Sequence, residues 1–217
     1  MAKSAGDIFY AVEQVLFDWS NTHAERTYTA GSQTKPSLLF MLRRACDALQ
    51  EVKPSAFVSV ANLQLSTQGV RHTLPSTAYR LLDIIRNRGS DGTANGNKIS
   101  YMSSRKEIDA VLPAWHSEEL VASNGIENYY YNFDEDPRTV WVYPGVPSTG
   151  WYVEAATSDY PGTISDADTE LEVFTTYYWS LVYHVTYQIF MGEHKFSSPE
   201  WAQSFLSKFY VSAGVTT

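Results

Sequence analysis

The stretch TVWVYPGVPSTGWYVEAATSDYP, residues 139–161, decides how the middle of the chain is interpreted. Two runs rich in aromatic and β-branched residues, 140–143 and 151–155, flank a loop of Pro, Gly and Ser. Runs of this kind separated by turn residues predict two strands of an antiparallel hairpin. Because Tyr and Trp are typical anchors of protein contacts, we expect the loop at 144–150 to lie at a surface that another chain contacts. The residues predicted to form this contact are Trp141, Tyr143, Pro144, Trp151 and Tyr152.

Further strand patterns precede this hairpin. The segment 59–75, SVANLQLSTQGVRHTLP, alternates apolar and polar residues around a glycine and predicts an earlier hairpin. An apolar run at 79–87 leads into a turn rich in Gly, Asn and Asp and then into another short strand. The turn DEDPR separates a run at 129–133 from the strand at 140–143, and 104–115 predicts one or two helical turns. The middle of the chain therefore predicts a mostly antiparallel β region.

Helical patterns begin the chain. A first helix is expected to start near Asp7, which is a plausible cap, with apolar residues recurring every three or four positions after it. A second helix is expected to start around Pro36. It should end at EVKPSAF, since the residue before Pro54 disfavours the helical conformation.

Helical patterns also end the chain. The segment 165–194 predicts one long helix that Ser165 or Asp166 caps and that Gly192 ends. Apolar residues recur through it at three- and four-residue spacing, and at about 1.5 Å per residue it would be roughly 35 Å long. Ser198 is expected to cap a last helix whose first residue is the following proline.

These elements predict an α+β fold, namely a helical bundle of about four helices with a β-rich antiparallel insertion in the middle of the chain. Because each helix has one apolar face to bury, the four helices are expected to pack together. The expected division is 1–57 for the N-terminal helices of the bundle, 58–164 for the β-rich insertion, and 165–217 for the C-terminal helices and tail.

Composition limits the classes of function. Of the 217 residues, 44% are hydrophobic and 18% charged, which is enough apolar material for a packed core. The net charge of −8 and the lack of a basic cluster longer than LRR at 42–44 argue against tight binding of nucleic acid, which needs a basic face. The N-terminus meets acidic residues before any long apolar run and does not predict a signal peptide. The run 174–191 is uncharged apart from His184, but its Thr, Ser and Gln favour a buried helix over a membrane span.

No motif nominates a catalytic, metal or cofactor site. GSDGTANGN at 89–97 lacks the lysine and the order of a phosphate-binding loop, and no G-x-S-x-G motif occurs. The five histidines form no pair at metal-ligand spacing, and Cys46 is expected to be a small buried helix residue. The acidic stretches DADTE at 166–170 and DEDP at 134–137 are interpreted as a helix N-terminus and a solvated turn. We therefore expect no catalytic residue, no metal and no cofactor.

The order of the motifs resembles the tail-adaptor, or head-to-tail connector, proteins of short-tailed bacteriophages. LPSTAYRLLDIIRN at 74–87, WVYPGVP at 141–147 and YVEAATSDYP at 152–161 are similar to strands of that family. A long aromatic helix ending in YQIFMGE and a short final helix follow, as in the family. The resemblance runs from about residue 35 onward, and it departs at Gly145, where the family often has a second proline.

The resemblance implies a structural protein of the virion and not an enzyme. Proteins of that family form a ring, usually of twelve copies, between the portal and the tail tube or nozzle, and they extend the DNA channel without binding DNA specifically. The resemblance places the chain in the virion tail at the portal vertex after synthesis in the host cytoplasm, with tail fibres as a further partner. The loop at 144–150 would then contact a neighbouring subunit or a distal tail protein. The resemblance also implies that the C-terminal segment docks on the portal, through Trp201, Phe205, Phe209 and Tyr210.

Alternatives remain open at this stage. The aromatic stripe of the last helix would equally well pack on the long helix of the same chain. The whole chain would also fit a monomeric, aromatic-rich module that binds a protein or a glycan, or a hydrolase whose catalytic groups converge from distant positions.

Overall fold

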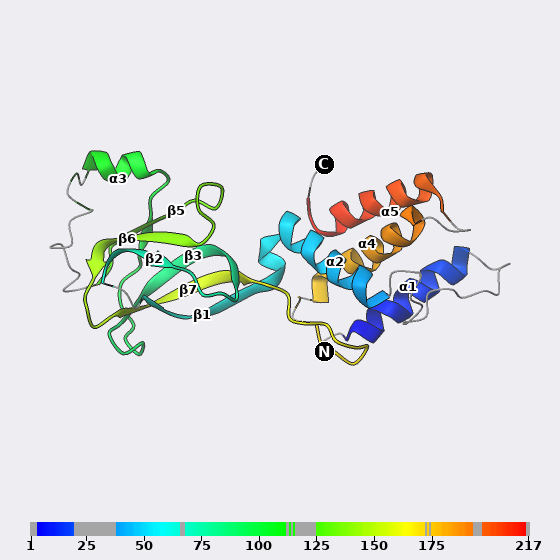
Figure 1. Cartoon of the computed structure of the whole chain (residues 1–217), viewed down its shortest axis with the longest axis horizontal. Coiled ribbons are helices and arrows are strands. Elements are labelled where there is room, and N and C mark those ends of the chain that lie inside the picture. The colour runs from blue at the N-terminus through cyan, green and yellow to red at the C-terminus, as the bar shows by residue number, and fades with distance from the viewer. Residues whose placement is uncertain are drawn as a thin grey trace. The chain divides into compact units, whose positions relative to one another are not determined.

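The computed structural model describes residues 4–19, 38–65, 68–111, 113, 115, 125–171, 173, 175–192 and 197–215. The chain divides into a helical unit of Met1–Phe57 with Pro161–Thr217 and a strand unit of Val58–Tyr160 (Figure 1). Helices from both ends of the chain thus form one unit, and the middle of the chain forms the other. The predicted α+β fold with a central β insertion is confirmed.

Four α-helices of the described residues form the helical unit. They are α1 (Ala5–Trp19), α2 (Leu38–Val52), α4 (Tyr178–Met191) and α5 (Pro199–Ser212). Short 3₁₀ helices, η1 (Pro54–Phe57) and η2 (Thr175–Tyr177), follow α2 and precede α4. Helix α4 contacts α1, α2 and α5, so it is the central helix of this unit. The unit's main core contains fully buried apolar side chains from all four helices, among them Ile8, Leu42, Leu49, Leu181 and Phe209.

The first helix begins earlier than predicted. The Asp7 backbone N–H donates to Ser4 Oγ at 3.3 Å, and the Ser4 N–H donates to Asp7 Oδ2 at 2.9 Å. This reciprocal pair is a capping box, in which the serine is the cap and the acid is the third helical residue. Ser4 therefore caps α1, and the prediction that Asp7 is the cap was wrong.

Helix α4 is much shorter than the predicted helix over 165–194. Its 14 residues span roughly 21 Å, and it ends at Gly192 as predicted. Upstream, Asp166 accepts hydrogen bonds from Thr169 Oγ1 at 2.9 Å and from the Asp168 N–H at 3.1 Å. Such side-chain bonds to nearby groups compete with helix formation. The stretch 166–170 is therefore a loop and not the helix N-terminus that was predicted.

This loop caps α1 instead. The N–H groups of Ala5 and Gly6, at the start of α1, donate to the carbonyls of Thr169 at 2.9 Å and Ala167 at 2.7 Å. The first amides of a helix lack partners within it, so the loop satisfies two of them. The acidic stretch thus has a structural role that its sequence alone did not reveal.

Two sheets form the strand unit. One has the order β1-β7-β3, and the other has the order β2-β6-β5-β4. All strand pairs are antiparallel except β4 with β5. The strands are β1 (Val58–Leu65), β2 (Gly69–Thr73), β3 (Ala78–Gly89), β4 (Ser100–Tyr101), β5 (Asn128–Tyr131), β6 (Thr139–Val146) and β7 (Trp151–Asp159), and helix α3 (Arg105–Val111) follows β4.

Both sheets line a common core. Leu81, Ile84 and Val153 from the first sheet pack in one cluster with Val140 and Val142 from the second. The two sheets therefore form a sandwich, in which alternate residues of each strand point inward.

Two of the predicted hairpins do not form. β1 pairs with β7 and β2 pairs with β6, so the segment 59–75 crosses from one sheet to the other. The stretch 139–161 crosses in the same way, because β6 and β7 also lie in different sheets. The hairpin of β5 and β6 around DEDPR is confirmed. Alternation of apolar and polar residues identifies a strand, but it does not reveal which partner the strand takes when two sheets share a core.

None of the described helices is long and apolar enough to cross a membrane.

Candidate interaction surfaces

Four aromatic rings follow one another along the seam between α4 and α5. The ring centroids are 5.8 Å apart for Trp179 and Tyr183, 6.2 Å for Tyr183 and Phe205, and 6.4 Å for Phe205 and Trp201. These distances allow favourable ring contacts. We call these four residues the aromatic ladder.

The antiparallel pairing of the two helices builds this ladder. At one end, the Ser198 N–H donates to the Phe190 carbonyl at 3.1 Å. At the other end, Ser212 Oγ donates to Ser180 Oγ at 2.9 Å. Residues four apart on each helix lie on one face, so the rings of α4 meet those of α5 along the seam.

The ends of the aromatic ladder face solvent, whereas its middle is covered. Trp179 is 49% exposed and Trp201 is 43% exposed, but Phe205 is only 6% exposed. Lys208 Nζ lies 4.8 Å from the ring centroid of Phe205 and 5.9 Å from that of Tyr183, within the range of a cation–π interaction. The ladder therefore presents two partly exposed indole rings, Trp201 beside buried Phe205 and Trp179 beside half-buried Tyr183.

The structure divides the four residues predicted to dock on the portal. Helix α5 begins as predicted, because Ser198 Oγ accepts from the Trp201 N–H at 3.4 Å and a proline occupies the first turn. Phe205 and Phe209 are buried, and Phe209 packs edge-on against His184 of α4 at 4.8 Å. Tyr210 is half-buried beside Phe209, and Trp201 is exposed. The two phenylalanines thus pack within their own chain, whereas the Trp201 side chain is 43% exposed.

Sequence reasoning missed the α4 half of the ladder. Trp179, Tyr183 and Tyr187 recur at four-residue spacing on a helix without Asp, Glu, Lys or Arg. That spacing places them on one face and was the available signal. It was not used because the whole segment was interpreted as one buried helix.

Trp141 and Tyr143 lie on the outer face of the second sheet. Their neighbours Val140 and Val142 point into the core, so strand alternation directs the two aromatic rings the other way. There they pack in a separate cluster with Val70, Tyr130 and the fully buried Trp115.

Two arginines lie over Trp141. The guanidinium carbons of Arg71 and Arg105 are each 5.6 Å from the centroid of the indole ring. Arg71 also lies 3.5 Å from Asp136, and Trp115 Nε1 donates to Asp109 at 2.7 Å. This outer cluster is therefore aromatic, with two arginines over Trp141 and the carboxylates of Asp136, Asp109 and Glu135 beside them.

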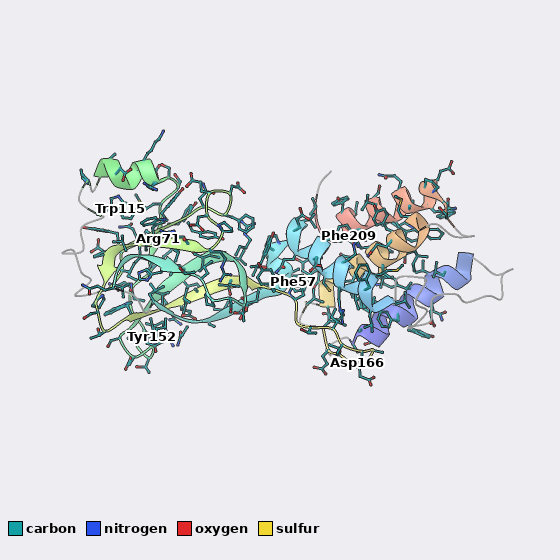
Figure 2. The ribbon with its side chains drawn as sticks, viewed as in Figure 1. Phe57, Arg71, Trp115, Tyr152, Asp166 and Phe209 are labelled. Carbon is teal, nitrogen blue, oxygen red and sulfur yellow. The ribbon has the colours of Figure 1, made fainter. Side chains whose placement is uncertain are left out.

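Trp151 and Tyr152, which were predicted to share this surface, lie on β7 in the other sheet. Trp151 packs against the core between the sheets, and its Nε1 donates to Asn87 Oδ1 at 2.9 Å. Tyr152 points to the opposite face, where its ring lies so close to Gly92 that a Cβ there would be 3.3 Å away. Figure 2 shows Tyr152 on the opposite side of the strand unit from Trp115 and Arg71.

The five predicted residues therefore do not form one surface. Pro144, the fifth of them, is half-buried within β6 and follows a cis peptide bond. The loop between the strands is correspondingly shorter than predicted and comprises 147–150.

Cys46 is buried, as predicted, and is not activated. It lines a cavity of about 170 Å³ in the helical unit with Phe57, Ile164, Glu170 and Leu171. Burial, with a smaller effect of Asp47, raises the pKa of its thiol to about 12. A thiol with this pKa is protonated at neutral pH and is a poor nucleophile. Among the described residues, no group of three or more His, Cys, Asp or Glu side chains could hold a metal ion.

His184 is a neutral core residue in the helical unit. Gln188 Nε2 donates to the Met41 carbonyl at 2.8 Å and lies 3.1 Å from His184 Nδ1. Because an amide nitrogen only donates, Nδ1 is an acceptor and the imidazole carries its proton on Nε2. Burial, followed by the charge of Arg44, lowers the pKa of His184 to about 4. The arrangement packs α4 against α2 and α5 and offers no catalytic base.

Exposed aromatic side chains on the helical unit and an aromatic cluster with arginines on the strand unit are typical of surfaces that contact other chains. The chain matches the model of the SU10 adaptor protein family over residues 11–213, and it therefore belongs to that family. This is a family of bacteriophage adaptors, so the chain is a structural phage protein and a component of the virion. No curated protein matches the chain.

Proposed function

We propose that this chain forms a ring of twelve copies between the portal and the tail tube or nozzle. The observation that carries the proposal is the family match, which extends across both units of the chain. The ring would sit at the portal vertex of the virion after synthesis in the host cytoplasm, and tail fibres are a further partner. Twelve chains of net charge −8 sum to roughly −96, which would discourage DNA from binding where acids face the channel.

The helical unit would attach to the portal through the aromatic ladder. Of the four residues first predicted for this role, Trp201 is exposed, Tyr210 is half-buried, and Phe205 and Phe209 hold α5 on α4. Trp179 adds a second exposed indole ring to the same seam. Interfaces depend on a few such aromatic anchors more than on total area.

The strand unit would contact a neighbouring subunit or a distal tail protein through the outer cluster around Trp141 and Tyr143. Arginines stacked on an indole ring suit a partner that offers carboxylates. Removing 147–150 tests the loop itself, since Pro144 belongs to a strand. Unchanged ring assembly and unchanged attachment of tail proteins would exclude the loop from both contacts.

Electron microscopy of the chain mixed with portal rings tests the proposal directly. The wild-type chain should add one further ring to each portal. Replacing Trp179 and Trp201 by Ala should weaken portal binding by ~30-fold or more, because an interfacial tryptophan contributes about 2 kcal/mol or more. The matched control replaces Tyr10 and Phe40, which are 65% and 48% exposed on α1 and α2, and it should bind normally. A chain that stays monomeric and does not bind portal rings would instead support the alternative function, a monomeric module that binds a protein or a glycan.

A further inference from the structure

Four strands lie at the edges of the two sheets. β1 and β3 border the first sheet, and β2 and β4 border the second. An edge strand has backbone N–H and C=O groups that no neighbouring strand satisfies. Proteins usually protect such edges with short strands, bulges, charged side chains or covering segments, because an open edge binds other strands.

Strand β3 is protected by several of these devices. Its pairing with β7 contains four register shifts, and it carries Arg80, Arg86 and Arg88. The chain after β3 also folds back along it. The Asn87 N–H donates to the Asn97 carbonyl at 2.9 Å, and the Gly96 N–H donates to the Asn87 carbonyl at 3.0 Å.

The edges of the second sheet are also protected. Strand β2 has only five residues, includes Arg71 and His72, and shifts register between Gly69 and Arg71. Strand β4 has only two residues and leads toward α3. Neither edge offers a long, regular row of backbone groups.

Strand β1 is less protected. The turn after β3 contacts it only through the Asn62 side chain, which donates to the Gly92 carbonyl at 3.0 Å and accepts from Arg88 Nε at 3.1 Å. All eight of its residues pair with β7 in one continuous register. Its sequence VSVANLQL has no charge, no Pro and no Gly, and the chain carries no charge from Ser55 to Val70. Among the described residues, its backbone forms no hydrogen bond outside the pairing with β7. Val60 is 56% exposed, and Figure 1 shows β1 at the border of the strand unit.

We infer that the free edge of β1 binds an extended, uncharged segment of another tail protein, which adds as a further strand to the β1-β7-β3 sheet. Main-chain hydrogen bonds supply the affinity in this mode of binding, and alternate side chains supply the specificity. Apolar residues of the added segment would lie beside Leu63 and Leu65, which pack on the core, and uncharged polar residues beside Asn62 and Gln64. The inference rests on the proposed function, since it names the contact by which the adaptor holds its tail-side partner.

The partner strand does not come from a folded sheet of a second copy. The other three edges of this chain are protected, so none of them can pair with β1. Two β1 strands would pair only about a two-fold axis, which closes a dimer and does not continue around a ring of identical contacts. The inference therefore assigns the strand to a different protein chain.

Amide hydrogen exchange on the peptide covering 58–65 tests the inference. It is measured in the isolated chain, in the chain bound to portal rings, and in intact virions. We expect fast exchange of the outward-facing amides in the first two samples and at least ~100-fold slower exchange in virions, since exchange then requires the added strand to open. Equal exchange in all three samples would overturn the inference. Protection that already exists with the portal alone would assign the edge to another copy or to the portal, which also overturns it.

A charge on the edge provides the second test. Ala61→Lys places a lysine on the exposed edge, and Ala110→Lys on exposed α3 is the matched control in the same unit. The Ala61→Lys variant should bind at least ~10-fold less tail-tube or nozzle protein, because an edge lysine opposes strand addition. The Ala110→Lys variant should bind the normal amount. If Ala61→Lys unfolds, Val60→Lys tests the same edge at a 56% exposed position. Normal recovery with a folded edge variant would overturn the inference and leave the proposed function intact, whereas a wild-type chain that binds no portal would refute the proposed function itself.

Discussion

The helical and strand units are stabilised in different ways. The main helical core is built mostly from apolar side chains of α1, α2, α4 and α5, and Gln50, Ser180, His184 and Thr186 are buried in the same unit. The strand unit also has an apolar core, but two polar side chains connect its segments through several hydrogen bonds each. Asn87 makes four such bonds and Arg138 makes three.

The hydrogen bonds of Asn87 and Arg138 show how polar side chains stabilise the strand unit. Asn87 donates to the carbonyls of Asn97 and Ile126 and accepts from the Ile126 N–H and Trp151 Nε1, at 2.7 to 3.2 Å. Arg138 donates to the carbonyls of Leu74 and Pro75 in the turn between β2 and β3 and of Ala78 at the start of β3. A helix satisfies most of its own backbone, whereas crossings between two sheets leave backbone groups that need other partners. The helical unit also has polar connections, such as Gln188 to the Met41 carbonyl and Ser212 to Ser180. In the strand unit, Asn87 and Arg138 each concentrate several such bonds on one side chain.

Removing an apolar contact should affect the helical unit most. Phe209 is 1% exposed and packs on His184, so Phe209→Ala should lower the free energy of unfolding by about 4 kcal/mol through the cavity it leaves. Val211→Ala, at a 75% exposed position on the same helix, is the control and should change it by less than about 0.5 kcal/mol. Urea denaturation followed by circular dichroism measures both. A loss below about 1 kcal/mol for Phe209→Ala would mean that α5 is not part of the core.

Removing a polar connection should affect the strand unit nearly as strongly. Asn87→Leu leaves the buried N–H and C=O of Ile126 and the indole N–H of Trp151 without this partner, and we expect a loss of about 3 kcal/mol. Hydrogen exchange should accelerate in β3 and β7 but not in α4. Asn95→Leu, in the exposed turn, is the matched control and should cost little. A neutral effect of Asn87→Leu would contradict the contrast between the two units.

The same contrast explains how much of the fold could be predicted from the sequence. Helix α5 and its Ser198 cap were predicted because local spacing and capping determine them. The pairing of β1 with β7 and of β2 with β6 was not predicted, since the alternation of apolar and polar residues in these strands fits more than one partner. The loop at 166–170 was misassigned because its acids suit a helix start equally well. Phe205 is buried and Trp201 is exposed although both lie on one stripe, because only packing against α4 distinguishes them.

Acid should destabilise both units through their buried histidines. The folded-state pKa of His184 is about 4, below the ordinary value of 6.5, so below pH 6.5 the unfolded chain binds a proton that the folded chain does not. The free energy of unfolding should therefore fall as pH falls from 6.5 to 4, by about 3 kcal/mol at most. Burial also lowers the pKa of His72 in the strand unit, which gives a loss in the same direction.

A variant isolates the contribution of His184. His184→Phe should flatten the pH dependence of α4 hydrogen exchange between pH 6.5 and pH 4, after correction for the intrinsic pH dependence of exchange, and leave that of β2 unchanged. An equally steep dependence in the variant would assign the acid sensitivity to other groups.

The smallest expected effect concerns the start of α5, where a local hydrogen bond supports the packing of the helix. Ser198 Oγ accepts from the Trp201 N–H at 3.4 Å in the first turn of the helix. Ser198→Ala should lower the free energy of unfolding by about 1 kcal/mol. Ser207→Ala is the matched control on the same helix, because Ser207 Oγ donates to the Gln203 carbonyl, which the helix already uses. Since Ala is the better helix former, the control should be neutral or slightly stabilising. Equal effects of the two substitutions would show that packing on α4 alone fixes where α5 begins.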